Sequence, residues 1–164
     1  MYARILVLID GYASGQLALD HAGDIVHACN ATLVLLHIVG ATADDDDDDD
    51  DMPHRWDTGE RLLAQAADSL RIDCIEVDTV LRRAAMGRRL PEQIALLSVE
   101  LGCDVMVVGM DGRRDGYALL FWDDGALVQL SPVTVILVRQ AHSSYASAST
   151  FGAAPLLERP GAQV

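Results

Sequence analysis

The sequence predicts an α/β fold in which an open, mostly parallel five-stranded sheet carries helices on both faces. Short apolar runs rich in Ile, Leu and Val alternate along the chain with segments that have a helical spacing of apolar residues. Several of the short runs are apolar at every position, which is typical of strands buried on both faces of a parallel sheet. Alternation of strands and helices in this order favours a parallel sheet covered on both sides.

Three elements are expected in the first part of the chain. Arg4 to Ile9 is predicted to be a buried strand, and Thr32 to Val39 is predicted to be a second, continuously apolar strand. Between them we expect a helix from Ser14 to Cys29. One stripe of this helix is apolar and can cover a face of the sheet; it consists of Ala18, Ala22, Ile25 and Cys29.

The middle of the chain is expected to hold a long connection, a helix and an outer strand. Gly40 to Trp56 is predicted to be a solvated or disordered loop, because every position from Asp44 to Asp51 is aspartate. A capping box predicts a helix from Asp57 to about Leu70, with Glu60 reaching back to the Asp57 N–H. Ile75 to Leu81 alternates apolar and polar residues, so we expect this strand near an edge of the sheet.

The last part of the chain is predicted to complete the alternation. Pro91 suits the first turn of a helix that ends at Gly102. Asp104 to Met110 is the fourth predicted strand, Phe121 to Leu130 a short helix and Val133 to Val138 the last strand.

The length predicts one domain, and the charge and composition exclude several classes of partner and mechanism. In 164 residues we expect a domain at 1–139, which includes the acidic loop at 40–56, and a disordered tail at 140–164. The net charge is −13, or −5 without the aspartate run, so no basic face for nucleic acid is expected. All twelve basic residues are arginine, which excludes mechanisms that need a P-loop lysine or a Schiff base.

Membrane, disulfide and zinc chemistry are not predicted. The apolar runs are too short to span a bilayer and the N-terminal residues do not form a signal peptide, so we expect a cytoplasmic protein. Cys29, Cys74 and Cys103 are widely spaced among apolar neighbours, which favours buried, reduced thiols.

A candidate ligand site lies where the fourth strand ends. Gly109, Gly112 and Gly116 follow or end this strand, and glycine allows backbone N–H groups to approach an anion closely. In open parallel sheets, ligands bind beyond the carboxyl ends of the strands. Asp111 and Asp115 in the same loop oppose an anion electrostatically.

Four segments together resemble the universal stress protein family: Ile5 to Gly11, Leu35 to Val39, Asp104 to Gly112 and Ser131 to Arg139. The resemblance covers roughly residues 3–139 and implies a Rossmann-like fold of the adenine nucleotide alpha hydrolase type. It also implies ATP as the cofactor of one branch of the family. The resemblance implies Asp10, Ile38, Gly109 and Gly112 as cofactor-binding residues, and we add Gly11 and Arg113 as candidates.

The implied nucleotide motif is incomplete in this chain. In the family's nucleotide binders the glycine loop reads Gly, two residues, Gly, nine residues, then Gly-Ser or Gly-Thr. Gly109 and Gly112 match its first half, but Phe121 and Trp122 or Trp122 and Asp123 stand where its second half should be. The lost glycine and hydroxyl would offer hydrogen-bond donors to phosphates at a helix N-terminus.

Several residues keep two interpretations at this point. Asp10 is interpreted either as a ligand to base or ribose or as a cap of the following helix. His37 fits a satisfied core histidine better than a ligand or base. Gly109 and Gly112 form either a phosphate cradle or a turn.

The charged segments also keep two interpretations. Arg82, Arg83, Arg88 and Arg89, predicted in the loop after the third strand, form either a basic pocket for an anion or a set of solvated charges. One hypothesis is that the aspartate run folds over these arginines and competes with a nucleotide; calcium capture by the run is a weaker alternative.

The function we expect is that of a non-catalytic regulatory or binding module in a stress response, with weak or absent ATP binding. The alternative is an ATP-binding universal stress protein that hydrolyses the nucleotide slowly. We predict no catalytic residues and no metal ligands. Both faces of the last strand are apolar, and the family resemblance implies a homodimer through Val133 to Val138.

Overall fold

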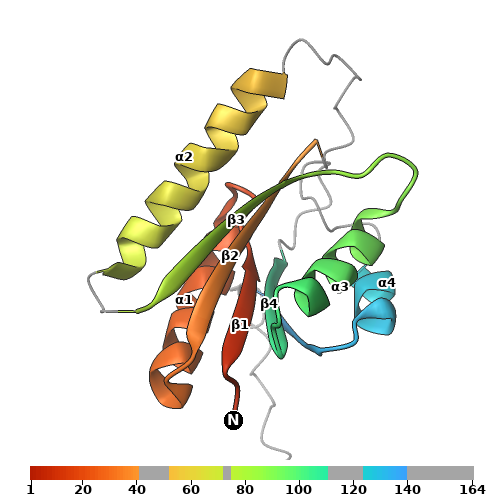
Figure 1. The fold of residues 1–164 in the computed structure, drawn as a ribbon. Coiled ribbons are helices and arrows are strands. Elements are labelled where there is room, and N and C mark those ends of the chain that lie inside the picture. Colours follow the sequence, from red (N-terminus) through yellow and green to blue (C-terminus); the bar gives the residue numbers. More distant parts are fainter. Residues whose placement is uncertain (41–51, 72–74, 111–123, 140–164) are drawn as a thin grey trace, which may run out of the picture.

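The computed structural model describes residues 1–40, 52–71, 75–110 and 124–139, in which strands and helices alternate (Figure 1). All strand pairs are parallel, and the strand order is β3-β2-β1-β4-β5. The predicted fold class is therefore confirmed, with a sheet that is entirely parallel. The elements are β1 (Arg4–Leu8), α1 (Ala13–Cys29), β2 (Thr32–Val39), α2 (Met52–Arg71), β3 (Val77–Arg83), α3 (Leu90–Glu100), β4 (Val105–Met110), α4 (Asp124–Leu130) and β5 (Thr134–Arg139).

The centre of the sheet is the most apolar part of the molecule. β1 lies between β2 and β4, with Leu6 paired to Val34 on one side and to Met106 on the other. These three side chains are fully buried. Continuous apolarity in the sequence thus corresponds to strands covered on both faces.

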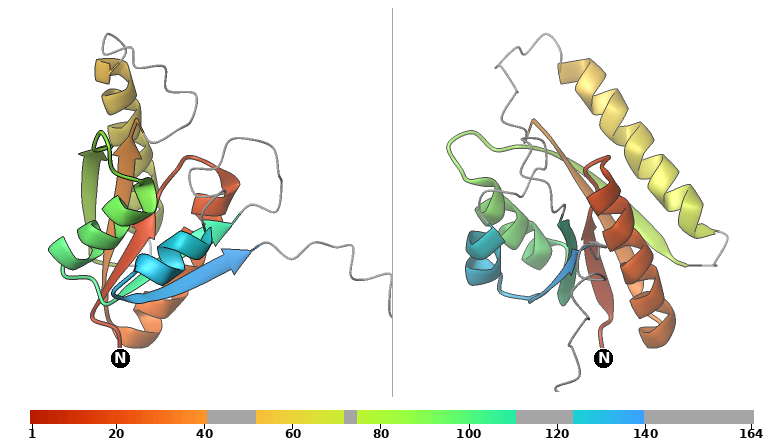
Figure 2. Two further views of the ribbon diagram at one scale, coloured as in Figure 1. Left: turned by 90° about the vertical axis from the view of Figure 1, so that its right-hand side faces the viewer. Right: turned by 180° about the vertical axis from the view of Figure 1, so that it is seen from behind.

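The helices form one layer on each face of the sheet, as Figures 1 and 2 show. α1 and α2 cover the face that carries Ile5 and Val7, whereas α3 and α4 cover the face that carries Leu6. Alternate residues of each strand therefore face the two layers. Each layer encloses its own apolar core, and the chain crosses from one side of β1 to the other when it passes from β3 to β4.

The second helix begins earlier than the sequence pattern predicts. α2 starts at Met52, so Asp57 and Glu60 lie within the helix and do not form a capping box at its start. Thr58 Oγ1 donates to the His54 carbonyl at 2.9 Å, and Trp56 Nε1 donates to Glu60 Oε1 at 3.3 Å, both contacts between residues four apart in the helix. The expected loop at 40–56 is therefore too long at its C-terminal end, while residues 41–51 lie outside the described part of the chain.

The third strand is displaced along the chain but occupies the expected place. β3 begins at Val77 and extends through Arg83, so Arg82 and Arg83 belong to the strand and not to the loop after it. Among the described strands it pairs with β2 alone and forms one edge of the sheet, which confirms the predicted edge position. Gly102 follows α3 with φ +66°, as expected of a glycine that ends a helix.

Candidate functional site

The candidate site lies where the strand order reverses, between the carboxyl ends of β1 and β4. Asp10 follows β1, Gly109 lies in β4 and Ile38 lies near the end of β2, and all three line one crevice. Sequence reasoning named these residues from three distant segments, and the fold brings them together. In an open parallel sheet this reversal is the usual place for a ligand.

Apolar side chains fill most of the crevice. Its wall on the α3 side is formed by Leu90 and Ile94, and the strands contribute Leu8, Leu36 and Val108. The space left between the described residues measures about 20 Å³. This is room for roughly one water molecule, and a purine ring requires several times more. Sequence reasoning missed the α3 wall, because periodicity places these residues in a helix without showing which strand end they cover.

The Asp10 carboxylate is engaged by the chain's own backbone and side chains. Its Oδ1 accepts a hydrogen bond from the Tyr12 N–H at 2.9 Å, and its Oδ2 accepts one from the Ser14 hydroxyl at 3.2 Å. Burial raises the pKa of Asp10, and the hydrogen bonds from Tyr12 and Ser14 oppose that shift. The N-cap residue of α1 is Tyr12, so Asp10 shapes the turn before the helix and is not its N-cap.

Gly109 lies against the first turn of α1 for a steric reason. A Cβ atom at this position would collide with the carbonyl oxygen of Ser14. Gly15 has the same role opposite Asp10, where a Cβ would lie 2.5 Å from Oδ1. The missing side chains let α1 begin directly over the ends of β1 and β4. A glycine at 109 therefore has a packing role whether or not a ligand binds.

The remaining predicted site residues divide into two groups. Gly11 lies in the turn after β1 with φ +81°, beside Leu62 of α2 and on the α1 side of the sheet, and it does not line the crevice. Gly112 and Arg113 lie outside the described residues. The same holds for Asp111, Asp115, Gly116, Phe121, Trp122 and the run Asp44 to Asp51.

His37, Cys29 and Cys103 do not line the crevice. The ring of His37 is half-buried, and its Nδ1 lies 2.6 Å from the Ile9 carbonyl oxygen, which is the geometry of a satisfied core histidine. Cys103 is buried, and burial raises the pKa of its thiol. Cys29 is only half-buried, and Cys74 lies outside the described residues.

Two negative findings apply to the described residues. Within them, His, Cys, Asp and Glu side chains do not form a group of three that could hold a metal ion. In the same part of the chain, every helix is too short or too polar to cross a bilayer.

Comparison with known proteins identifies the family of the chain. The family model of the universal stress protein family matches residues 1–139. The chain belongs to the universal stress protein family. A search of curated proteins finds no match to this universal stress protein.

Solved universal stress proteins share the fold at low sequence identity. One from Burkholderia pseudomallei is 19% identical with a TM-score of 0.66, covering 84% of this chain and 96% of that one. One from Arabidopsis thaliana with AMP bound is 14% identical with a TM-score of 0.62, covering 90% and 97%. One from Archaeoglobus fulgidus in complex with dAMP is 16% identical with a TM-score of 0.57, covering 83% and 97%. These likenesses show the universal stress protein fold.

Proposed function

We propose that this universal stress protein is a non-catalytic regulatory or binding module of a cytoplasmic stress response, with weak or absent ATP binding. The observation that carries the proposal is the state of the crevice, in which apolar side chains leave about 20 Å³. Among the described residues that line it, Asp10 is the one carboxylate, and it already accepts hydrogen bonds from Tyr12 and Ser14. A nucleotide has to displace the apolar wall and compete for that carboxylate.

A specific observation favours a second candidate function, adenine-nucleotide binding with slow hydrolysis. Asp10, Ile38 and Gly109 meet at the reversal of strand order, and solved relatives are described with AMP and dAMP bound. Leu90 and Ile94 belong to one helix, so a small displacement of α3 would widen the crevice. Such a displacement exposes apolar surface, which lowers the net affinity for any ligand that requires it.

Isothermal titration with ATP and with AMP, each with and without magnesium, distinguishes the two functions. The proposed function predicts no heat of binding, or a Kd of about 1 mM or weaker. A Kd in the low micromolar range would overturn it in favour of the second candidate. Measuring phosphate release from ATP over the same conditions tests the hydrolysis that the second candidate includes.

A blocking variant shows whether any observed binding uses this crevice. Ile38→Trp fills the remaining space beside Asp10, whereas Val128→Trp adds the same side chain at an exposed position of α4. Binding in the crevice is lost in the first variant and kept in the second. Binding that survives in both variants belongs to another part of the protein.

A further inference from the structure

The end of β3 and the turn between β3 and α3 form a basic segment in an acidic protein. Residues 82–89 hold four of the twelve arginines, and no acidic residue occurs between Asp78 and Glu92. The chain as a whole has a net charge of −13. Residues 84–89 form the turn itself, which is called the arginine turn below, and it extends beyond the sheet in Figure 1.

A buried glutamine fixes the backbone of the arginine turn. The Gln93 side chain, in the first part of α3, accepts a hydrogen bond from the Ala85 N–H at 2.7 Å. Its amide nitrogen donates to the carbonyls of Ala85 and Arg88, at 3.2 and 2.7 Å. At the start of the turn, the Ala84 N–H donates to the Val39 carbonyl at 2.8 Å. The turn is thus anchored to the core of the molecule, although its outer residues are exposed.

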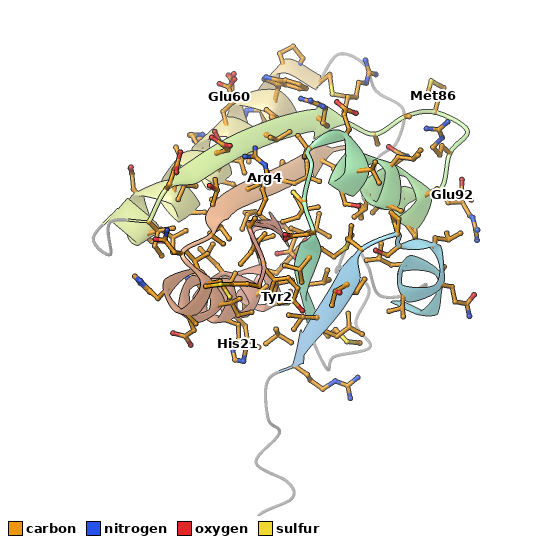
Figure 3. The ribbon with its side chains drawn as sticks, turned by 60° about the horizontal axis from the view of Figure 1, so that its bottom comes forward. Tyr2, Arg4, His21, Glu60, Met86 and Glu92 are labelled. Carbon is orange, nitrogen blue, oxygen red and sulfur yellow. The ribbon has the colours of Figure 1, made fainter. Side chains whose placement is uncertain are left out.

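The outer end of this fixed turn presents an apolar side chain to solvent. Met86 is 90% exposed, and Figure 3 shows it pointing outward, on the side of the molecule where Glu92 of α3 also lies. Gly87 follows with φ +74°, a conformation that bends the chain sharply and that side chains of L residues rarely adopt. A long apolar side chain held this far into solvent gains nothing from folding.

The arginines near Met86 differ in whether they form ion pairs. Arg82 pairs with Glu100 at 3.4 Å, and Arg89 pairs with Glu92 at 3.0 Å. Arg88 is exposed next to Gly87, and its guanidinium has no ion-pair partner among the described residues. A methionine and an arginine therefore stand two residues apart on a backbone whose conformation is already fixed.

We propose that the arginine turn is a docking site for an acidic segment of a partner protein, in which Met86 contacts an apolar residue and Arg88 contacts carboxylates. Methionine adapts to varied apolar surfaces, and arginine is enriched at protein interfaces. Because Gln93 holds the turn in advance, docking does not have to order the loop, which removes part of the entropic cost of binding. Residues 84–89 do not line the crevice, so the docking proposal does not rest on nucleotide binding.

The chemistry of the turn favours an acidic peptide over other anions. A nucleotide phosphate is best bound where several donors converge in a concave site, whereas Met86 stands at the convex tip of the turn. Binding to an anionic bilayer usually takes a cluster of about four to eight basic residues, whereas Arg82 and Arg89 already pair with Glu100 and Glu92. An extended acidic segment with an apolar residue matches both the charge of Arg88 and the exposure of Met86.

Fluorescence anisotropy on the full-length protein tests the docking site. The probe is a short fluorescent peptide of glutamates around a pair of leucines, and its counterpart replaces the glutamates with glutamines. The glutamate peptide is expected to bind more tightly than the glutamine peptide. Its affinity should fall several-fold as the salt concentration rises from about 0.05 to 0.5 M.

Two variants and two matched controls locate the binding. Met86→Ser and Arg88→Gln should each weaken the glutamate peptide by about 5- to 20-fold. Val99→Ser, which removes an exposed apolar side chain from α3, and Arg61→Gln, which removes an exposed arginine from α2, should leave it unchanged. Circular dichroism confirms that all four variants fold.

Four results would overturn the proposal. The first is equal binding by the wild type and by the Met86 and Arg88 variants, and the second is equal binding of the two peptides. The third is stronger binding to phosphatidylserine vesicles than to the peptide, which would assign the turn to a membrane surface. The fourth is displacement of the peptide by millimolar ATP in the Ile38→Trp variant, which would show that the turn binds phosphate and not an acidic segment of a partner.

Discussion

At the residue scale, one carboxyl group determines how the chain turns from β1 into α1. Asp10 lies in a partly buried position where it is the acceptor for the Tyr12 N–H and the Ser14 hydroxyl. Burial disfavours the charged form and the hydrogen bonds favour it, and the net result is a raised pKa. The geometry of the turn is stabilised by the acceptor oxygens, while the negative charge itself is unfavourable in the folded state.

Replacing Asp10 with asparagine separates these two contributions. Because the folded pKa lies above the ordinary value of 3.8, the folded state binds more protons than the unfolded state in the interval between the two values. The free energy of unfolding contributed by Asp10 therefore falls as pH rises through that interval and stays low above it. Asp10→Asn keeps an acceptor oxygen and removes the charge, so it should be more stable than the wild type at pH 7 and lose that advantage at pH 3.

Urea denaturation of both proteins across the acidic range measures this difference. Asp10→Ala is the control, since it removes the acceptor as well and leaves the Tyr12 N–H without its partner. That variant should be less stable than the wild type at neutral pH. An Asp10→Asn protein that is less stable than the wild type at pH 7, with the same pH dependence, would contradict the assignment.

At the element scale, the packing of α2 on the sheet depends on a missing side chain. A Cβ on Gly59 would lie 2.7 Å from His37 Cδ2 and 2.8 Å from Leu81 Cδ1. The His37 ring cannot turn away easily, because its Nδ1 is held 2.6 Å from the Ile9 carbonyl oxygen. Glycine lowers the helix propensity at this position, but its missing side chain lets α2 lie close to β2 and β3.

Gly59→Ala tests this account against a second helical glycine. The variant should lower the free energy of unfolding by about 1 to 3 kcal/mol, since the steric conflict outweighs the gain in helix propensity. Gly125→Ala in α4, where an added Cβ meets nothing within 4 Å, should instead be neutral or stabilising by up to about 1 kcal/mol. Thermal or chemical denaturation of the pair measures both values, and equal effects at the two sites would refute the packing role of Gly59.

These elements also show what the sequence could and could not predict. The order of strands and helices follows from apolar runs and periodicity, and the edge position of β3 follows from its alternation. The start of α2 was predicted wrongly, because the spacing of Asp57 and Glu60 fits a cap as well as two positions inside a helix. Pro53, in the first turn of the observed helix, was the better signal.

For the site, the sequence predicted positions but not contacts. Asp10, Ile38 and Gly109 were found from strand ends and from the family resemblance, and they do meet in space. The collision that keeps Gly109 a glycine and the α3 wall of the crevice depend on how helices cross strands. Those crossings arise from tertiary packing, which local periodicity does not determine.

At the scale of the whole molecule, the two edges of the sheet differ in composition. β3 presents Asp78, Arg82 and Arg83, charges that discourage pairing with another strand. β5 reads Thr-Val-Ile-Leu-Val-Arg, and Leu137 remains 40% exposed. A parallel sheet with one charged and one apolar edge can extend at the apolar edge.

We propose that β5 is the dimer interface and that two copies of the chain associate through it. Size-exclusion chromatography with light scattering should give the mass of a dimer for the wild type at tens of micromolar. Leu137→Lys places a charge on that edge, where burying an ammonium group in an apolar contact is costly, so the variant should shift to the mass of a monomer. Thr79→Lys, an equivalent change on the exposed side of β3, should leave the dimer intact, because that edge takes no part in the contact. A wild-type monomer at these concentrations would show that the chain does not form this dimer. Loss of the dimer in Thr79→Lys alone would place the interface away from β5.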